Sequence, residues 1–134
     1  MGTLVGAWKL VSFEETSPDG ERTQPYGPDP VGILIYTGTG YMCVQIMRRD
    51  RPALPDLAFE EIGAAQIKEV VGGFTAFSGT YQADPDNHIV IHHVQCHVLP
   101  GSVGKDLRRR YELEGDTLVL WPTPTRAVTW ERVK

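Results

Sequence analysis

The 134-residue sequence has no excess of basic residues. Thirteen Lys and Arg stand against 17 Asp and Glu, which gives a formal net charge of −4. Because nucleic acids and anionic membrane surfaces both attract basic proteins, neither is expected as the main partner. The sequence also lacks any run near the roughly 20 apolar residues of a membrane span, and its first ten residues lack the features of a signal peptide. These absences predict a cytoplasmic protein.

Cysteine is scarce as well. Cys43 and Cys96 are the two cysteines, and they do not form a C-x-x-C motif. The simplest interpretation is a pair of buried, independent thiols in a reducing compartment. A disulfide or a metal-binding pair is the alternative.

Familiar catalytic and cofactor motifs are missing. The sequence contains no G-x-S-x-G, P-loop, H-E-x-x-H or G-x-G-x-x-G motif, so no cofactor is predicted. Three of the four histidines lie in the segment HHVQCH, but on a strand His92 and His93 point to opposite faces, and His93 and His97 are roughly 13 Å apart. Zinc ligands must converge to about 2.0–2.1 Å from the metal, so no metal site is predicted. A site that combines His93 with distant residues is the alternative.

The sequence is rich in turn residues instead. Its 14 glycines and 10 prolines fall at short intervals between runs typical of β-strands. Eight strands are predicted, over residues 6–15, 31–37, 41–48, 74–83, 88–98, 105–113, 117–121 and 126–133. Short strands at this spacing, with no repeat or linker, predict an all-β protein with one domain over residues 1–134, built as a small antiparallel barrel or sandwich.

The segment 57–73 has a helical pattern. Its apolar residues share one face at helical spacing, at Phe59, Ile62, Ile67 and Val70. Asp56 is a suitable N-cap, and Gly72 and Gly73 can end the helix. We predict one amphipathic helix of about four turns within residues 57–71, which covers one end of the barrel. A mobile lid over a cavity mouth is the alternative.

Two tryptophan motifs lie near the ends of the chain. Gly6-Ala7-Trp8 stands on the first predicted strand, and Trp130-Glu131-Arg132 stands on the last. This pair resembles the lipocalin-like (calycin) barrels. The segments YGPDPVG (26–32), HHV (92–94) and RRYEL (109–113) are similar to the short bacterial and fungal lipocalin-like domain family. The resemblance implies a barrel of about eight strands in which Trp8 packs with Arg132 where the barrel closes. Related small barrels include both ligand carriers and cofactor-free enzymes of natural-product pathways.

Strand pairing predicts which side chains face the barrel interior. Residues 88–98 are paired with 105–114 around Ser102, and 105–114 with 117–121 across a two-residue turn. Because opposed residues share a face, the interior is expected to hold four polar residues, His93, Gln95, Arg109 and Tyr111. The same face carries Ser78, Ile91, Leu107, Leu113, Leu118 and Leu120. The residues expected to face solvent are His92, Arg108, Arg110 and Glu112.

Two further groups of residues have two interpretations each. The hairpin 31–47 offers an apolar stripe that is either core or pocket wall: Ile33, Ile35, Met42, Val44 and Ile46. The charged run RRDR at 48–51 is expected to be a solvated loop, and a rim that attracts an anionic ligand is the alternative.

The interior polar residues suggest the function. A buried arginine is costly unless it is paired or faces water, so Arg109 needs a partner, a ligand or a wet cavity. A structural hydrogen-bond network is one interpretation, and a ligand-orienting site is the other. In the second, the barrel binds one small hydrophobic molecule. The residues expected to contact it are Ser78, Gln95, Ile35, Met42, Val44, Leu118 and Leu120.

The favoured hypothesis is a cofactor-independent cyclase, isomerase or dehydratase acting on a polyketide- or terpenoid-like substrate. His93 is then the general acid/base, Tyr111 a hydrogen-bond donor and Arg109 the group that stabilises an enolate or carboxylate. A non-catalytic binder of small hydrophobic ligands is the alternative, and an interaction module whose barrel is filled by its own side chains is a third. A homodimer is a further expectation.

Overall fold

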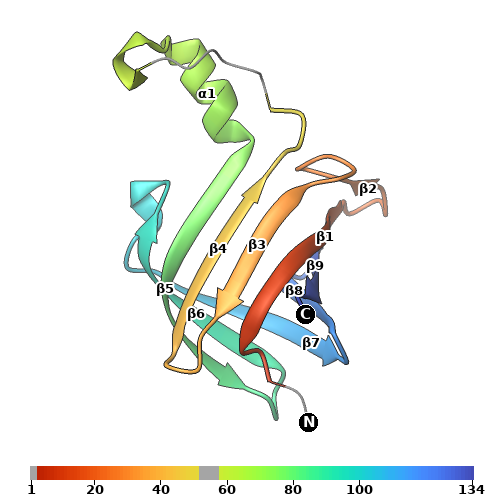
Figure 1. Cartoon of the computed structure of the whole chain (residues 1–134). Coiled ribbons are helices and arrows are strands. Elements are labelled where there is room, and N and C mark those ends of the chain that lie inside the picture. The colour runs from red at the N-terminus through yellow and green to blue at the C-terminus, as the bar shows by residue number, and fades with distance from the viewer. Residues whose placement is uncertain (1–2, 52–57) are drawn as a thin grey trace.

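The computed structural model describes residues 3–51 and 58–134. Nine strands form one antiparallel sheet (Figure 1). In chain order they are β1 (Gly6–Thr16), β2 (Arg22–Thr23), β3 (Val31–Tyr36), β4 (Tyr41–Met47), β5 (Phe74–Asp84), β6 (Ile89–His97), β7 (Asp106–Glu114), β8 (Thr117–Thr123) and β9 (Arg126–Arg132). Each long strand pairs with the next, and β1 also pairs with β9. This last pairing closes an eight-stranded barrel, with the short β2 attached to the end of β1.

All eight predicted strands are present within two residues of their expected limits, and the predicted barrel is confirmed. The strands are specified by alternation of apolar and polar residues with turn residues between them. In β3, for example, Leu34 and Tyr36 are buried while Ile33 and Ile35 are exposed. The alternation fixes one buried face for each strand.

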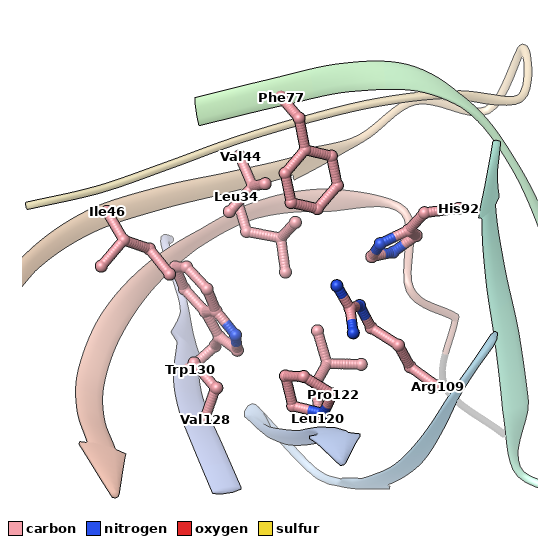
Figure 2. A pocket seen from close by; sticks show the side chains of 10 residues that line it. All are labelled: Leu34, Val44, Ile46, Phe77, His92, Arg109, Leu120, Pro122, Val128 and Trp130. Carbon is pink, nitrogen blue, oxygen red and sulfur yellow. The ribbon is translucent and has the colours of Figure 1, made fainter. Parts of the chain in front are cut away.

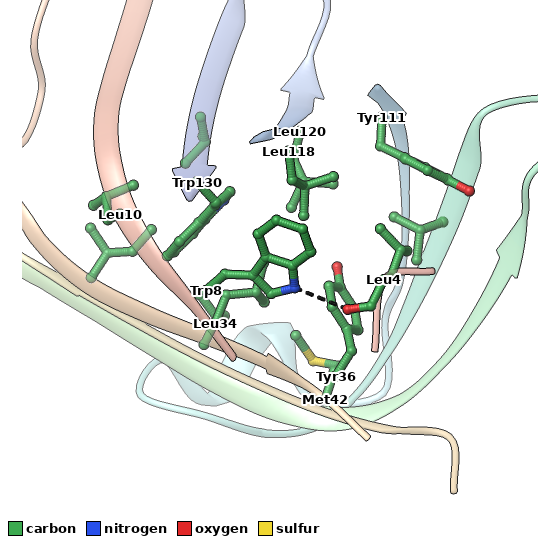
Figure 3. Close-up of a cluster of buried hydrophobic side chains, with 14 of the residues drawn as sticks. Leu4, Trp8, Leu10, Leu34, Tyr36, Met42, Tyr111, Leu118, Leu120 and Trp130 are labelled. Atoms are coloured by element: carbon green, nitrogen blue, oxygen red, sulfur yellow. Dashed lines mark hydrogen bonds between the residues drawn. The ribbon is translucent and has the colours of Figure 1, made fainter. Parts of the chain in front are cut away.

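The two ends of the barrel differ. One end carries short turns at 37–40, 85–88 and 115–116, and the other carries the long connections 17–30, 48–73 and 98–105. At the short-turn end the N-terminal segment fills the interior. The indole Nε1–H of Trp8 holds this segment in place by donating a hydrogen bond of 2.9 Å to the Leu4 carbonyl (Figure 3). Leu4 and Trp8 are both buried. This end is a packed hydrophobic core, so any cavity must lie toward the long connections.

The helical segment is shorter than predicted. A 3₁₀ turn, η1 (Phe59–Glu61), precedes a helix α1 (Ala64–Gly72) of nine residues. The helix begins at Gly63, whose N–H donates to the Gln66 side chain. The expected N-cap, Asp56, lies outside the described residues. Gly73 ends the helix, as expected.

The position of α1 also differs from the expected barrel cover. It has no buried residue, and it extends from the start of β5 beyond the barrel (Figure 1). The Arg51 guanidinium contacts the C-terminal end of α1. It donates a hydrogen bond of 3.3 Å to the Val70 carbonyl and lies 5.1 Å from the centroid of the Phe74 ring. A second 3₁₀ turn, η2 (Pro100–Ser102), lies in the connection between β6 and β7.

Candidate functional site

A cavity of about 50 Å³ lies inside the barrel. Its lining residues are Leu34, Val44, Ile46, Phe77, His92, Arg109, Leu120, Pro122, Val128 and Trp130 (Figure 2). Most of them are apolar, and Ile46, Phe77 and Val128 stand where β4, β5 and β9 meet their connections at the long-connection end. A water molecule takes about 30 Å³ of liquid volume, whereas pockets for drug-sized ligands measure about 300–1,000 Å³. The cavity therefore has room for a small polar head group.

Arg109 brings a positive charge into this cavity from β7. Among the ion pairs of the described residues, none involves its guanidinium. Burial lowers the pKa of Arg109 below its usual value. Even a half-buried cation loses part of its hydration, so this position favours an anionic group in the cavity.

His92 of the cavity wall forms a second polar unit with Tyr36, which lies behind it. Their Oη and Nε2 atoms share a hydrogen bond of 2.6 Å, and both residues are almost fully buried. Burial, with a further contribution from the charge of Arg109, lowers the pKa of His92 from 6.5 to about 3. Burial raises the pKa of Tyr36. At neutral pH the imidazole is therefore neutral and the phenol keeps its proton.

Two nitrogen atoms of the cavity wall lack partners. Neither Nδ1 of His92 nor Nε1 of Trp130 has a hydrogen-bond partner in the described part of the chain, although both atoms are buried. Figure 2 shows these rings and the Arg109 guanidinium directed toward the same space. When Tyr36 donates to Nε2 of His92, the imidazole proton lies on Nδ1. The wall then offers three hydrogen-bond donors, which suit an acceptor-rich group such as a carboxylate.

The barrel closes through the pair of residues predicted from the two tryptophan motifs. The Arg132 guanidinium lies 4.3 Å from the centroid of the Trp8 ring, which is fully buried. The same side chain donates hydrogen bonds of 2.8 Å to the carbonyls of Thr3 and Val5. The contact therefore joins the first strand, the last strand and the N-terminal segment.

A family model described as the lipocalin-like domain matches residues 5–133. The chain belongs to this family. The barrel is also similar to the crystal structure of a lipocalin-like protein from Bacteroides uniformis, with 16% identity, a TM-score of 0.54, and coverage of 98% of this chain and 100% of that chain. A mutant of the fluorescent protein UnaG aligns over 97% of this chain and 96% of its own, with 12% identity and a TM-score of 0.39. No curated protein matches the chain.

The lipocalin-like fold is compatible with binding of a small hydrophobic ligand. In the described parts of the chain, no helix is long and apolar enough to cross a membrane. Over the same residues, no cluster of three or more His, Cys, Asp or Glu side chains could hold a metal ion.

Several predicted interior residues do lie inside the lipocalin-like barrel. Arg109, Val44 and Leu120 line the cavity. Three others are buried in the adjoining hydrophobic core, Met42, Tyr111 and Leu118. The outward positions predicted for Arg108 and Arg110 are confirmed.

The interior position predicted for His93 and Gln95 is wrong. Gln95 is exposed, and His93 points outward, where its Nδ1 lies 2.7 Å from Oδ1 of Asp106. His92, expected outside, is the buried neighbour. The β6–β7 ladder ends at His93 opposite Asp106, so the connection is not centred on Ser102. This offset shifts the pairing by an odd number of residues, which inverts every side chain of β6 relative to β7.

Ser78 and Ile35 are wrong for the same kind of reason. The prediction for Ser78 depends on the pairing of β5 with β6, so its side chain turns outward when the face of β6 is inverted. Ser78 lies opposite Cys43 and Cys96, and both cysteines are exposed. Ile35 pairs with Cys43, whereas the buried Met42 pairs with Tyr36. Ile33 is exposed for the same reason. The two cysteines are therefore free, exposed thiols and not buried ones.

Sequence reasoning missed His92, Phe77 and Trp130 as cavity residues, and Tyr36 as the partner of His92. One signal was present: Gly79 interrupts the β5 pattern, and an isolated glycine in a strand often marks a bulge. The β5–β6 pairing does shift there, since Ser78 pairs with Cys96 and Gly79 with Val94.

The charged run at 48–51 ties connections together at the barrel mouth. Arg48 pairs with Asp50 at 2.9 Å and donates 3.1 Å to the Pro25 carbonyl, while Arg49 pairs with Asp29 at 2.8 Å. Arg51 holds the end of α1, as described above. The guanidinium groups of this run therefore bind protein groups of the neighbouring connections.

Proposed function

We propose that this lipocalin-like barrel binds one small, mostly apolar molecule that carries an anionic head group, and that Arg109 pairs with this group inside the cavity. The observation that carries the proposal is a half-buried guanidinium in a cavity wall with no carboxylate partner among the described residues. A ligand carboxylate supplies the missing charge, and charge-assisted hydrogen bonds of this kind are the strong ones.

The surrounding side chains support the same ligand class. His92 and Trp130 add two unpaired nitrogen atoms, and the rest of the wall is apolar. The cavity holds only the head group, so the apolar part of the ligand extends toward the long connections. Phe77 lies on this path, with its ring stacked on His97 at 5.4 Å between centroids. Movement of Phe77 enlarges the site.

The location of the ligand can be tested by quenching of tryptophan fluorescence. A brominated decanoate is expected to quench the wild-type protein and the Trp121→Phe variant, because Trp121 does not line the cavity. The Trp130→Phe variant is expected to lose most of this quenching. Equal quenching of the Trp130→Phe variant would place the ligand elsewhere.

Isomerisation, cyclisation or dehydration of such a ligand is a second candidate function. It is favoured by one observation, the unpaired Nδ1 of His92 in the cavity wall, which replaces His93 as the acid/base group. The pKa of about 3 weighs against it, since a general base works best with a pKa near the working pH. Binding is therefore the primary proposal. Incubation with polyketide-like carboxylates, followed by mass spectrometry and NMR, tests turnover. If the carboxylates are recovered unchanged, catalysis is contradicted and binding remains the proposed function.

We also propose a reducing compartment such as the cytoplasm. Cys43 and Cys96 are both exposed and free, and exposed thiols of this kind are typical of reducing environments.

A further inference from the structure

The outer surface of β1, β3, β4 and β5 differs in charge from that of β7. Within residues 7–11, 31–35, 41–47 and 74–80, the only charged residue is Lys9. We call the outward-facing side chains of these four segments the apolar face. The strand β7, on another side of the barrel, presents five charged residues outward in nine positions: Asp106, Arg108, Arg110, Glu112 and Glu114. Charged side chains are thus sparse on the apolar face and dense along β7.

Large apolar side chains are exposed on this face. Ile33 is 56% exposed, Tyr41 55%, Val11 49% and Ile35 39%. Scattered apolar residues are normal on a protein surface, but a contiguous apolar patch indicates an interaction site. Figure 1 shows β1, β3, β4 and β5 side by side as one broad layer, and α1 does not cover it.

The apolar face has a ridge between two hollows. Ile33 and Ile35 of β3 form the ridge. On the β5 side, a hollow of about 320 Å³ is lined by the small residues Ala76 and Ser78 and by Cys96. On the β1 side, a groove of about 580 Å³ runs along Ala7, and Lys9, Asp29 and Arg49 also line it. A ridge and a hollow on the same face are the requirement for a self-complementary contact.

We propose that two copies of this chain associate through their apolar faces, with the two-fold axis running along β4. Rotation about this axis places β3 of one copy opposite β5 of the other. Cross-strand pairing sets Ile35 in one row with Cys43 and Ser78, and Ile33 in one row with Gln45 and Ala76. Each isoleucine of one copy therefore lies opposite a small residue of the other. An axis perpendicular to the strands would instead set isoleucine against isoleucine.

Area and charge both fit a second copy. Four strands about 4.8 Å apart and three rows of outward residues about 6.7 Å apart give a sheet face of roughly 400 Å². Small specific interfaces bury about 600 Å² of accessible surface per partner, and the side chains that protrude from the apolar face add accessible surface to its flat area. Each chain has a net charge of −4, so two copies approach best through these four strand segments, which contain no Asp or Glu.

The proposed axis predicts different positions for the two cysteines in the dimer. Cys43 lies on β4, so the two Cys43 residues of a dimer face each other, whereas Cys96 lies opposite β1 of the other copy. Packed sheets are about 10 Å apart, which is too far for a disulfide but within reach of a short bismaleimide. Both thiols are exposed in the single chain, so both can react.

Sedimentation equilibrium of the full chain tests the association. The wild type is expected to be dimeric at high concentration, and Ile33→Glu or Ser78→Arg to be monomeric with unchanged circular dichroism. Val103→Glu is the matched control, because Val103 is 50% exposed but lies outside the apolar face; it is expected to remain dimeric. A wild type that is monomeric at every concentration, or an Ile33→Glu variant that still dimerises, overturns the proposal.

Cross-linking with a short bismaleimide tests the axis. Cys96→Ser is expected to give a covalent dimer through Cys43, and Cys43→Ser is expected to give none. The reverse pattern, with cross-linking through Cys96 alone, overturns the proposed axis.

Discussion

The Tyr36 hydroxyl oxygen lies 2.6 Å from Nε2 of His92, and this hydrogen bond joins β3 to β6 across the barrel interior. Both side chains are buried, so removal of either partner leaves a buried polar atom of the other unpaired. The pair therefore links the stability of the barrel to the geometry of the cavity wall.

A double-mutant cycle measures this link. Tyr36→Phe and His92→Phe are each expected to lower the free energy of unfolding by about 1–3 kcal/mol, since each leaves one polar group without a partner. The double variant is expected to lose less than the sum of the two, with a coupling of about 1–2 kcal/mol in urea unfolding. Tyr36→Phe combined with His93→Phe is the control, and strict additivity is expected there because His93 points outward.

The pH dependence of stability follows from the lowered pKa of His92. The folded protein holds His92 neutral down to a pKa of about 3, whereas the unfolded chain protonates it near 6.5. The unfolded state binds more protons between these values, so stability falls as the pH decreases from about 6.5 toward 3. The expected loss from this residue alone is about 2 kcal/mol between pH 7 and pH 5.

Urea unfolding at pH 7 and pH 5 tests this expectation. His92→Gln should lose much of the difference between the two pH values, and His93→Gln should keep it. A wild-type protein that is equally stable at both pH values would show that His92 titrates alike in the folded and unfolded states.

Gly79 is expected to be intolerant of any side chain. A Cβ atom at this position would clash with the His93 carbonyl oxygen at the β5–β6 bulge, and backbone atoms cannot move aside cheaply. Gly79→Ala should lower the free energy of unfolding by at least about 2 kcal/mol. Gly38→Ala serves as control, because a Cβ there meets nothing within 4 Å. Similar stability of the two variants would contradict the bulge geometry.

The fold could be predicted from the sequence because its signals are local. Alternation and turn residues set the eight strands, and the family resemblance identified the contact between Trp8 and Arg132. The prediction of which residues face the interior depended on whether the strand register is shifted by an odd or an even number of residues, and no local sequence signal determines this. His92 and His93 are identical in type and adjacent, so an odd shift in the β6–β7 connection was enough to exchange their roles.

Arg109 was placed correctly because β7 and β8 are joined by a two-residue turn, which leaves no freedom in register. Val44 and Leu120 were also placed correctly, but the neighbours from β3, β5, β6 and β9 could not be derived, since these strands join through longer or irregular connections. The cavity is a property of several strands together, and each contributes only one or two side chains to it.

The central claim is that Arg109 binds the anionic head of an apolar ligand, and calorimetric titration with decanoate and decanol tests it most directly. The two probes share an alkyl chain and differ in charge. The wild type is expected to prefer decanoate by about 10–100-fold, the range for a buried charged hydrogen bond. Arg108→Gln, the outward neighbour, should keep this preference, and Arg109→Gln should lose it while remaining folded. An Arg109→Gln variant with the wild-type preference, or a wild type that binds neither probe, would contradict the account.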